Sequence, residues 1–121
     1  MTRVFVVART AAARLALASR LEGPDLEVVG TGTAPDAAST DPDVLVLGDE
    51  TLLVGDLLAP AVVVLADDGA RLLPALRRLS ARGWAVVPRD APAAELRAAV
   101  TAAVHGLAAF PAGLTPRQAG E

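Results

Sequence analysis

Few side chains in this sequence could act as a nucleophile, a general base or a metal ligand. The chain has no cysteine and one histidine, His105, which excludes disulfides, thiolate metal sites and histidine-based triads or metal clusters. The remaining candidates are carboxylates, such as Asp49 and Asp67, and guanidinium groups, at Arg9 and Arg89. Two arginines that flank one crevice could bind a carboxylate or a phosphate. These residue types favour ion pairing or anion binding, and no base–nucleophile pair can be assigned.

The composition narrows the class of protein further. At 121 residues the chain fits one domain, and 53% of its residues are hydrophobic. All its basic side chains are arginine, yet its net charge is −3, which argues against electrostatic binding to nucleic acid by this segment alone. The apolar run at 4–7 is interrupted at Arg9 and is too short for a signal peptide or a membrane span. We therefore expect a soluble, cytoplasmic protein with no membrane partner.

Short apolar runs alternate with helix-like segments along the chain. Strands are predicted over 3–7, 26–29, 44–47, 61–65 and 85–87, and helices over 11–22, 68–81 and 93–105. An unbroken apolar run is typical of a strand buried on both faces. Thr10 fits the N-cap of the first helix, and Pro74 predicts either a late start or a kink in the second.

This alternation predicts βαβ units in an α/β fold, a doubly wound parallel sheet with helices on both faces. About a dozen residues connect the strand that ends at Val29 to the strand that starts at Val44. A connection of similar length joins Leu47 to Ala61. Both lengths are near the lower limit for a connection that contains a crossover helix. Helices two and three are therefore predicted to be reduced to a turn or two. Gly55 weakens the third, over 50–58, further.

In doubly wound sheets the functional crevice lies beyond the carboxyl ends of the strands. Four turns are therefore expected to meet there. They are 8–10 after the first strand, 48–50 after the third, 66–68 after the fourth and 88–90 after the fifth.

Three stretches carry a family resemblance. Residues 82–92 and 95–100 resemble the end of a response-regulator receiver domain, with its last strand, a basic turn and a final helix that begins Glu-Leu. Residues 42–47 resemble the approach to the phosphorylated aspartate, and 114–118 resemble the opening of the helix-turn-helix domain of the LuxR/NarL class. The resemblance covers essentially the whole chain and implies a flavodoxin-like, five-stranded sheet in the order 2-1-3-4-5.

The resemblance also implies that the family's phosphorylation site is degenerate in this chain. The acidic pair that would hold Mg²⁺ is replaced by Ala8 and Arg9, the phospho-accepting aspartate by Gly48, and the switching Ser/Thr by Ala66. Only the basic residue after the fifth strand is kept in type, as Arg89. Since Mg²⁺ needs oxygen ligands and glycine has no nucleophile, the usual aspartyl-phosphate chemistry is expected to be absent, with no metal and no cofactor.

The charged residues of this pocket have alternative interpretations. Asp49 follows the acceptor position by one residue and could substitute as acceptor, but a one-residue shift turns a strand side chain to the other face. Asp67 and Asp68 could be metal ligands, although adjacent carboxylates before a helix more often cap it. Arg9 is expected to pair with Asp49 or Asp67, and the alternative is that it binds an anion together with Arg89.

A second surface is predicted to mediate dimerisation. In the receiver family the face formed by helix four, strand five and helix five often pairs two copies, whereas some members use helices one and five. Arginines and acidic residues interspersed with apolar ones would suit a symmetric interface, and a solvated surface is the alternative. The candidate dimer face comprises Arg71, Leu76, Arg77, Leu79, Trp84, Asp90, Arg97 and Val100.

The sequence thus predicts a receiver-like regulatory domain over 1–110 and, over 111–121, a linker and the start of a truncated helix-turn-helix domain. The leading hypothesis is a phosphorylation-independent receiver and dimerisation domain of a transcription factor, which is not an enzyme. It would contact DNA only through a downstream domain. The alternative hypothesis is a domain that senses a small anion or metabolite in the degenerate pocket. Signal would enter through a regulatory protein or a small-molecule ligand.

Overall fold

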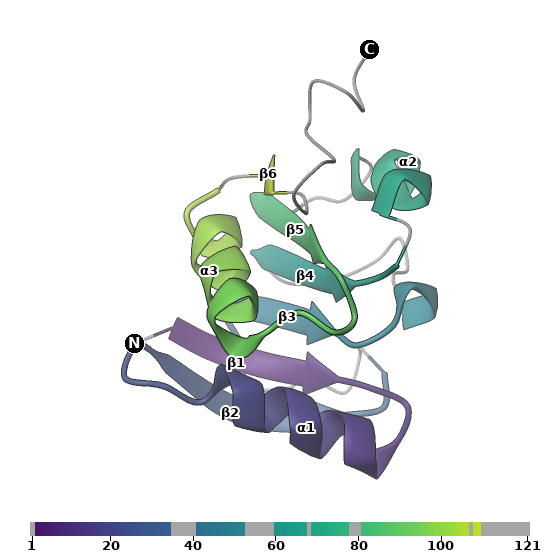
Figure 1. The fold of residues 1–121 in the computed structure, drawn as a ribbon. Helices are drawn as coiled ribbons and strands as arrows, with labels where there is room; N and C mark the ends of the chain where they lie inside the picture. Colours follow the sequence, from purple (N-terminus) through teal and green to yellow (C-terminus); the bar gives the residue numbers. More distant parts are fainter. Residues whose placement is uncertain are drawn as a thin grey trace.

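A computed structural model of the chain describes residues 2–34, 41–52, 60–67, 69–77, 81–106 and 108–109. In this part of the chain a single all-parallel sheet runs in the order β2-β1-β3-β4-β5-β6 (Figure 1). The strands are β1 Thr2–Val7, β2 Leu26–Gly32, β3 Val44–Leu47, β4 Ala61–Leu65, β5 Gly83–Val87 and β6 Ala108–Ala109. The first five strands confirm the predicted doubly wound order.

A sixth strand of two residues extends the predicted five-stranded sheet at its β5 edge. After the last helix, Gly106 adopts a φ of +82°, a left-handed conformation that glycine reaches without steric cost. The chain then turns back along β5, where Ala108 pairs with Trp84 and Ala109 with Ala85. Two alanines carry no strand-like sequence pattern, and this short strand was therefore not predicted.

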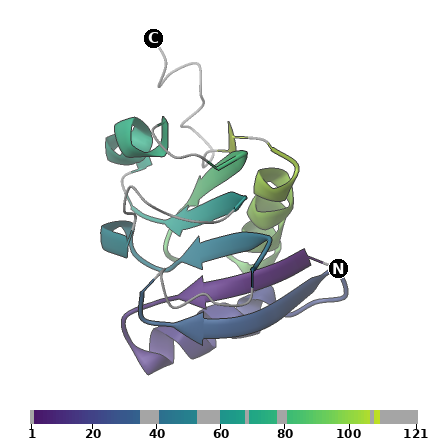
Figure 2. The ribbon, with the colours of Figure 1, turned by 180° about the vertical axis from the view of Figure 1, so that it is seen from behind.

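Helices lie on both faces of the sheet. On one face lie α1, Ala11–Leu21, and α3, Ala93–Val104, side by side (Figure 1). On the other lie the single-turn 3₁₀ helix η2, Glu50–Leu52, the 3₁₀ turn η3, Gly69–Leu72, and the short helix α2, Leu73–Arg77 (Figure 2). No helix among these residues is long and apolar enough to cross a membrane.

Local sequence explains how two of the helices begin. The hydroxyl of Thr10 accepts a hydrogen bond from the N–H of Ala13 at 3.1 Å, so Thr10 is the N-cap of α1 as predicted. In the predicted helix 68–81, a 3₁₀ turn precedes α2, and Pro74 lies in the first turn of α2, where its missing N–H removes no helical bond. Of the two predicted alternatives, a late start and a kink, the structure shows the late start. The predicted end was too late, because Ala81 is not helical, while 78–80 lie outside the described residues.

The shortened connections agree with the prediction where the structure describes them. After β3 only the single turn η2 is helical before residue 53, and residues 53–59 lie outside the described part. In the connection from β2 to β3, residues 33–34 and 41–43 are not helical, and 35–40 lie outside it.

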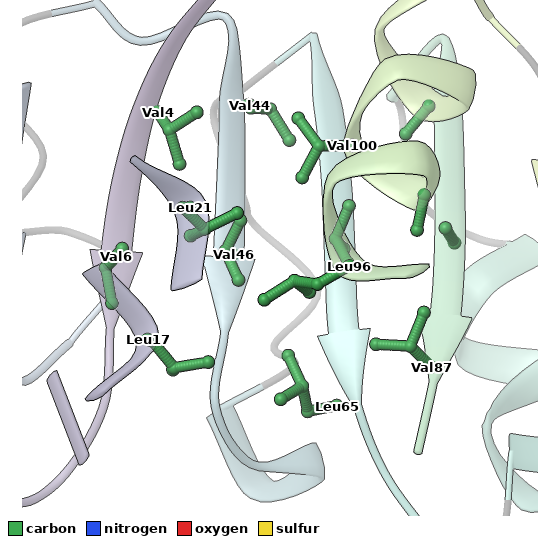
Figure 3. Close-up of a cluster of buried hydrophobic side chains, with 14 of the residues drawn as sticks. Val4, Val6, Leu17, Leu21, Val44, Val46, Leu65, Val87, Leu96 and Val100 are labelled. Atoms are coloured by element: carbon green, nitrogen blue, oxygen red, sulfur yellow. The ribbon is translucent and has the colours of Figure 1, made fainter. Parts of the chain in front are cut away.

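Two apolar clusters, one on each face of the sheet, form the core. In β1, β3, β4 and β5, alternate residues enter different clusters: Val4 and Val6 lie on the α1–α3 side (Figure 3), and Phe5 and Val7 lie on the other. All of β3 and β4 is buried, as expected of central parallel strands. The sheet thereby forms a rigid support for the turns at its carboxyl edge.

Candidate functional site

The structure brings the four predicted turns together at the carboxyl edge of the sheet. Three of them continue the backbone ladder for one residue past their strand. The N–H of Ala8 donates to the carbonyl of Gly32 at 3.0 Å, that of Gly48 to Val7 at 2.8 Å, and that of Ala66 to Val87 at 2.9 Å. Backbone hydrogen bonds of this kind fix the positions of the side chains that follow.

Gly48, the position that the receiver resemblance assigns to the phosphate acceptor, is tightly packed. A Cβ atom placed on Gly48 would lie 3.0 Å from Cδ1 of Leu17, 3.3 Å from Cβ of Ala8 and 3.4 Å from the carbonyl oxygen of Val7. Leu17 belongs to α1 and is buried, as are Ala8 and Ala66. The floor of the crevice is therefore apolar and tightly packed, and a side chain at position 48 would need the end of Leu17 to give by a few tenths of an ångström.

Above this floor, Arg89 joins two of the turns. Its Nη2 lies 3.6 Å from Oδ1 of Asp49, and its Nε lies 3.9 Å from Oδ2 of Asp67. The Asp67 side chain is 80% exposed and that of Asp49 26%. Since solvent screens an exposed ion pair strongly, the contact with Asp49 is the stronger of the two.

Thr51 connects Asp49 to the first turn. Its backbone N–H donates to Oδ1 of Asp49 at 2.8 Å, and its hydroxyl accepts a hydrogen bond from Nη2 of Arg9. One polar network, made of Arg9, Thr51, Asp49, Arg89 and Asp67, therefore ties together the turns that follow β1, β3, β4 and β5. We refer to these five residues as the crevice network.

Asp49 has a perturbed pKa. The hydrogen bond from the Thr51 N–H is the largest cause and lowers the pKa of the carboxyl below its ordinary value, and the Thr51 hydroxyl, Arg89 and Arg9 act in the same direction. Partial burial opposes them. The network thus favours the charged form of Asp49.

The arrangement corrects the predicted partner of Arg9. Arg9 was expected to pair with Asp49 or Asp67, but in the structure Arg89 contacts both carboxylates and Arg9 donates to Thr51. The reason is the Asp-Glu-Thr turn, which places the Thr51 hydroxyl on the Arg9 side of Asp49. Thr51 was not predicted as a site residue, although aspartate side chains often accept a hydrogen bond from the backbone N–H two residues on.

The remaining residues considered for metal or polar chemistry lie apart from one another. His105 is exposed and forms the C-terminal cap of α3, close to the carboxyl end of the helix dipole. Asp67 pairs with Arg89, and Asp68 lies outside the described residues. Among the residues that the structure describes, no group of three histidine or acidic side chains could hold a metal ion.

Some of the candidate dimer-face residues lie in the core. Leu76 and Val100 are 1% and 0% exposed, because each points from its helix onto the sheet, and they cannot contact a partner directly. Arg97 faces the other way, toward α1, where its Nη1 donates to the carbonyl of Glu22 at 3.2 Å.

The other candidate dimer-face residues differ in exposure. Arg71 and Asp90 are exposed, and Trp84 is half-buried against the second core cluster. Leu79 and the side chain of Arg77 lie outside what the structure describes. The face as a whole stays a prediction.

A groove lies at the opposite, amino edge of the sheet, away from the crevice. Its volume is about 340 Å³, and it is lined by Gly23, Pro24, Asp25, Leu26, Arg97, Ala98 and Thr101. It was not predicted, and it shares no residue with the crevice network.

Several solved structures share this fold. ChrA, the response regulator of a heme-sensing two-component system, superposes with a TM-score of 0.67 at 26% identity, over 98% of this chain and 62% of ChrA. The fold is that of a response-regulator receiver domain. The receiver domain of NarL from Mycobacterium tuberculosis gives a TM-score of 0.69 at 23% identity, over 87% of this chain and 97% of that one.

A LuxR-family DNA-binding response regulator from Silicibacter pomeroyi gives a TM-score of 0.71 at 23% identity, over 94% of this chain and all of its own. This chain spans less than two thirds of ChrA, which is the longer protein. No family model matches the sequence, and no curated protein matches it.

Proposed function

We propose that this chain is a signal-receiver domain that works without aspartyl phosphorylation and is not an enzyme. The observation that carries the proposal is the packing at Gly48, the position that the receiver resemblance assigns to the phosphate acceptor. No nucleophilic side chain is present there, and Leu17 and Ala8 pack tightly around the place that the first atom of one would take.

The residues of the first turn support the same proposal. Positions 8 and 9, which would carry Mg²⁺-binding acids in a phosphorylated receiver, hold a buried alanine and an arginine. Magnesium is bound through oxygen ligands, and the guanidinium of Arg9 is a fixed cation close to where such an ion would bind. The residues present do not fit a metal-assisted phosphoryl transfer.

The test is exposure to a small phosphodonor. The protein is incubated with acetyl phosphate and Mg²⁺, and its intact mass is measured beside that of a receiver domain that retains the acidic pair and the aspartate. We expect a phosphoryl adduct on the second protein alone. An adduct on this chain that disappears in Asp49→Asn would identify Asp49 as a substitute acceptor and overturn the proposal.

As the wider context of the domain we propose a LuxR/NarL-type transcription factor in the cytoplasm. The chain would form a homodimer, and DNA would be bound only by a downstream domain whose first residues fall within 111–121. This segment and its role lie outside the described residues. The similar structures support this context, since they include a LuxR-family DNA-binding response regulator and dimers of RcsB bound to DNA.

A second candidate function is sensing of a small anion. It is favoured by the exposure of Arg9 and of Arg89, whose side chain is 49% exposed at the crevice. A metabolite that binds there would raise the melting temperature, and the increase would be lost in Arg9→Ala. A thermal-shift screen with carboxylates and phosphates distinguishes this function from the first.

A further inference from the structure

The crevice network has the composition of an oxyanion site that already contains an anion. Oδ1 of Asp49 accepts the Thr51 N–H at 2.8 Å and faces the Arg89 guanidinium at 3.6 Å. The second guanidinium, that of Arg9, does not contact Asp49 directly but donates a hydrogen bond to the Thr51 hydroxyl. A backbone N–H, a hydroxyl and two guanidinium groups are the donors that proteins use to bind phosphate or sulfate.

The charge of the crevice network depends mainly on Asp49. Its two arginines are balanced by two aspartates, but Asp67 is 80% exposed and its oxygen is 3.9 Å from Arg89. Asp67 therefore contributes little. Without Asp49 the network would have a net positive charge, and the Thr51 N–H would lose its acceptor.

We propose that Asp49 is a tethered anion that occupies an oxyanion site formed by Arg9, Thr51 and Arg89, and thereby excludes free phosphate from it. This inference rests on the proposed function, because Asp49 can occupy the site permanently only if no phosphoryl group takes its place in the crevice. A carboxylate fixed on the same turn competes at an effective concentration in the millimolar range. Inorganic phosphate at lower concentration cannot displace it.

The test is to remove the tethered anion and offer a free one. Asp49→Ala empties the site, and the variant is titrated with inorganic phosphate at constant ionic strength, with the amide resonance of Thr51 and the melting temperature as readouts. We expect phosphate to bind the variant at least tenfold more tightly than the wild-type protein. Asp49→Asn, which keeps the shape without the charge, is the second variant should the alanine variant not fold.

Three controls locate the binding. Asp25→Ala removes the same charge at the amino edge of the sheet and should leave phosphate binding as weak as in the wild-type protein. Adding Arg89→Gln or Arg9→Gln to Asp49→Ala should abolish the gain. Equal binding by the wild-type protein and Asp49→Ala, or no binding by either Asp49 variant, would overturn the inference.

The phosphodonor experiment and this titration test different claims, so either claim can be contradicted without the other. An adduct on the wild-type chain contradicts phosphorylation-independent function, whereas the titration tests only whether Asp49 blocks an anion site.

Discussion

At the scale of single residues, Gly48 is defined by the lack of space around it. Its backbone is not in the left-handed region, so an alanine there would be acceptable to the main chain. The constraint is steric, because the nearest side-chain atom, Cδ1 of Leu17, would lie 3.0 Å from an added Cβ. Any constraint on Gly48 therefore comes from packing and not from backbone conformation.

A double-mutant cycle tests this packing. Gly48→Ala should destabilise the protein by about 1–3 kcal/mol through overpacking, and Leu17→Ala by about 2–5 kcal/mol through a cavity. In the double variant each change relieves the other, so the total cost should fall below the sum by more than about 0.5 kcal/mol. Urea unfolding of the four proteins gives the coupling.

The matched control for this cycle is Leu15→Ala. Leu15 lies on the same helix but is 74% exposed, so its effect should add to that of Gly48→Ala without coupling. Equal coupling in the two cycles would show that Leu17 does not limit the space at position 48.

Because the Asp49 carboxyl is stabilised in its charged form, the stability of the protein should depend on pH. Because the pKa of this carboxyl is lowered in the folded protein, the charged form stabilises the fold at pH values above the pKa of the unfolded chain. This contribution, about 0.5 kcal/mol for a partly exposed pair, is lost as the pH falls through the folded pKa. The difference in unfolding free energy between the wild-type protein and Asp49→Asn should therefore shrink below about pH 4.

Urea titrations between neutral and acidic pH measure that difference. A difference that stays constant over the whole range would contradict the role of Asp49 in the network. Adding Arg89→Gln should weaken the dependence in part, because Thr51 still donates to the carboxylate.

At the scale of elements, the turn between α3 and β6 has one conformational requirement. Gly106 ends α3 with a φ of +82°, and its N–H donates to the carbonyl of Ala103 at 3.0 Å. The chain that leaves this turn pairs with β5 at Trp84. The placement of the sixth strand thus depends on a residue that tolerates the left-handed region.

Gly106→Ala should therefore cost about 1–2 kcal/mol of stability, because a Cβ penalises this conformation. It should also shift the fluorescence of Trp84, which is the one tryptophan of the chain, as β6 loosens from β5. Gly106→Asn is the control and should cost less, since asparagine adopts the left-handed region more readily. An alanine variant as stable as the wild-type protein, with unchanged emission, would contradict this account.

At the scale of the whole molecule, dimerisation is the prediction that the structure sharpens. Because Leu76 and Val100 are core residues, a dimer on the predicted face would use exposed charged groups such as Arg71 and Asp90. The contacts would then be polar and sensitive to salt. Arg97 lies instead on the side of α3 that faces α1.

Light scattering should therefore show a dimer that weakens at high salt and in Asp90→Arg. Ala98→Arg on the exposed side of α3 is the comparison, and it should have no effect. If Ala98→Arg disrupts the dimer and Asp90→Arg does not, the interface involves α1 and α3. A monomer at high concentration would contradict both.

The parts of the fold that could be predicted are those set by local pattern. Unbroken apolar runs predicted β1, β3 and β4 because central parallel strands are buried on both faces, and Thr10 and Pro74 predicted how two helices begin. The pairing of Arg89 with Asp49, in place of Arg9, depends on side-chain reach across turns that are distant in sequence. β6 was missed because tertiary pairing with β5, and not strand propensity, determines it.

The tight packing of the crevice floor limits what a single substitution could achieve there. A carboxylate at position 48 alone would meet Leu17 and would find no metal-binding acids at positions 8 and 9. A single substitution at this edge of the sheet would therefore not create a metal-assisted phosphate acceptor, since Mg²⁺ also needs oxygen ligands. Several substitutions would be needed together, at position 48 and in the first turn.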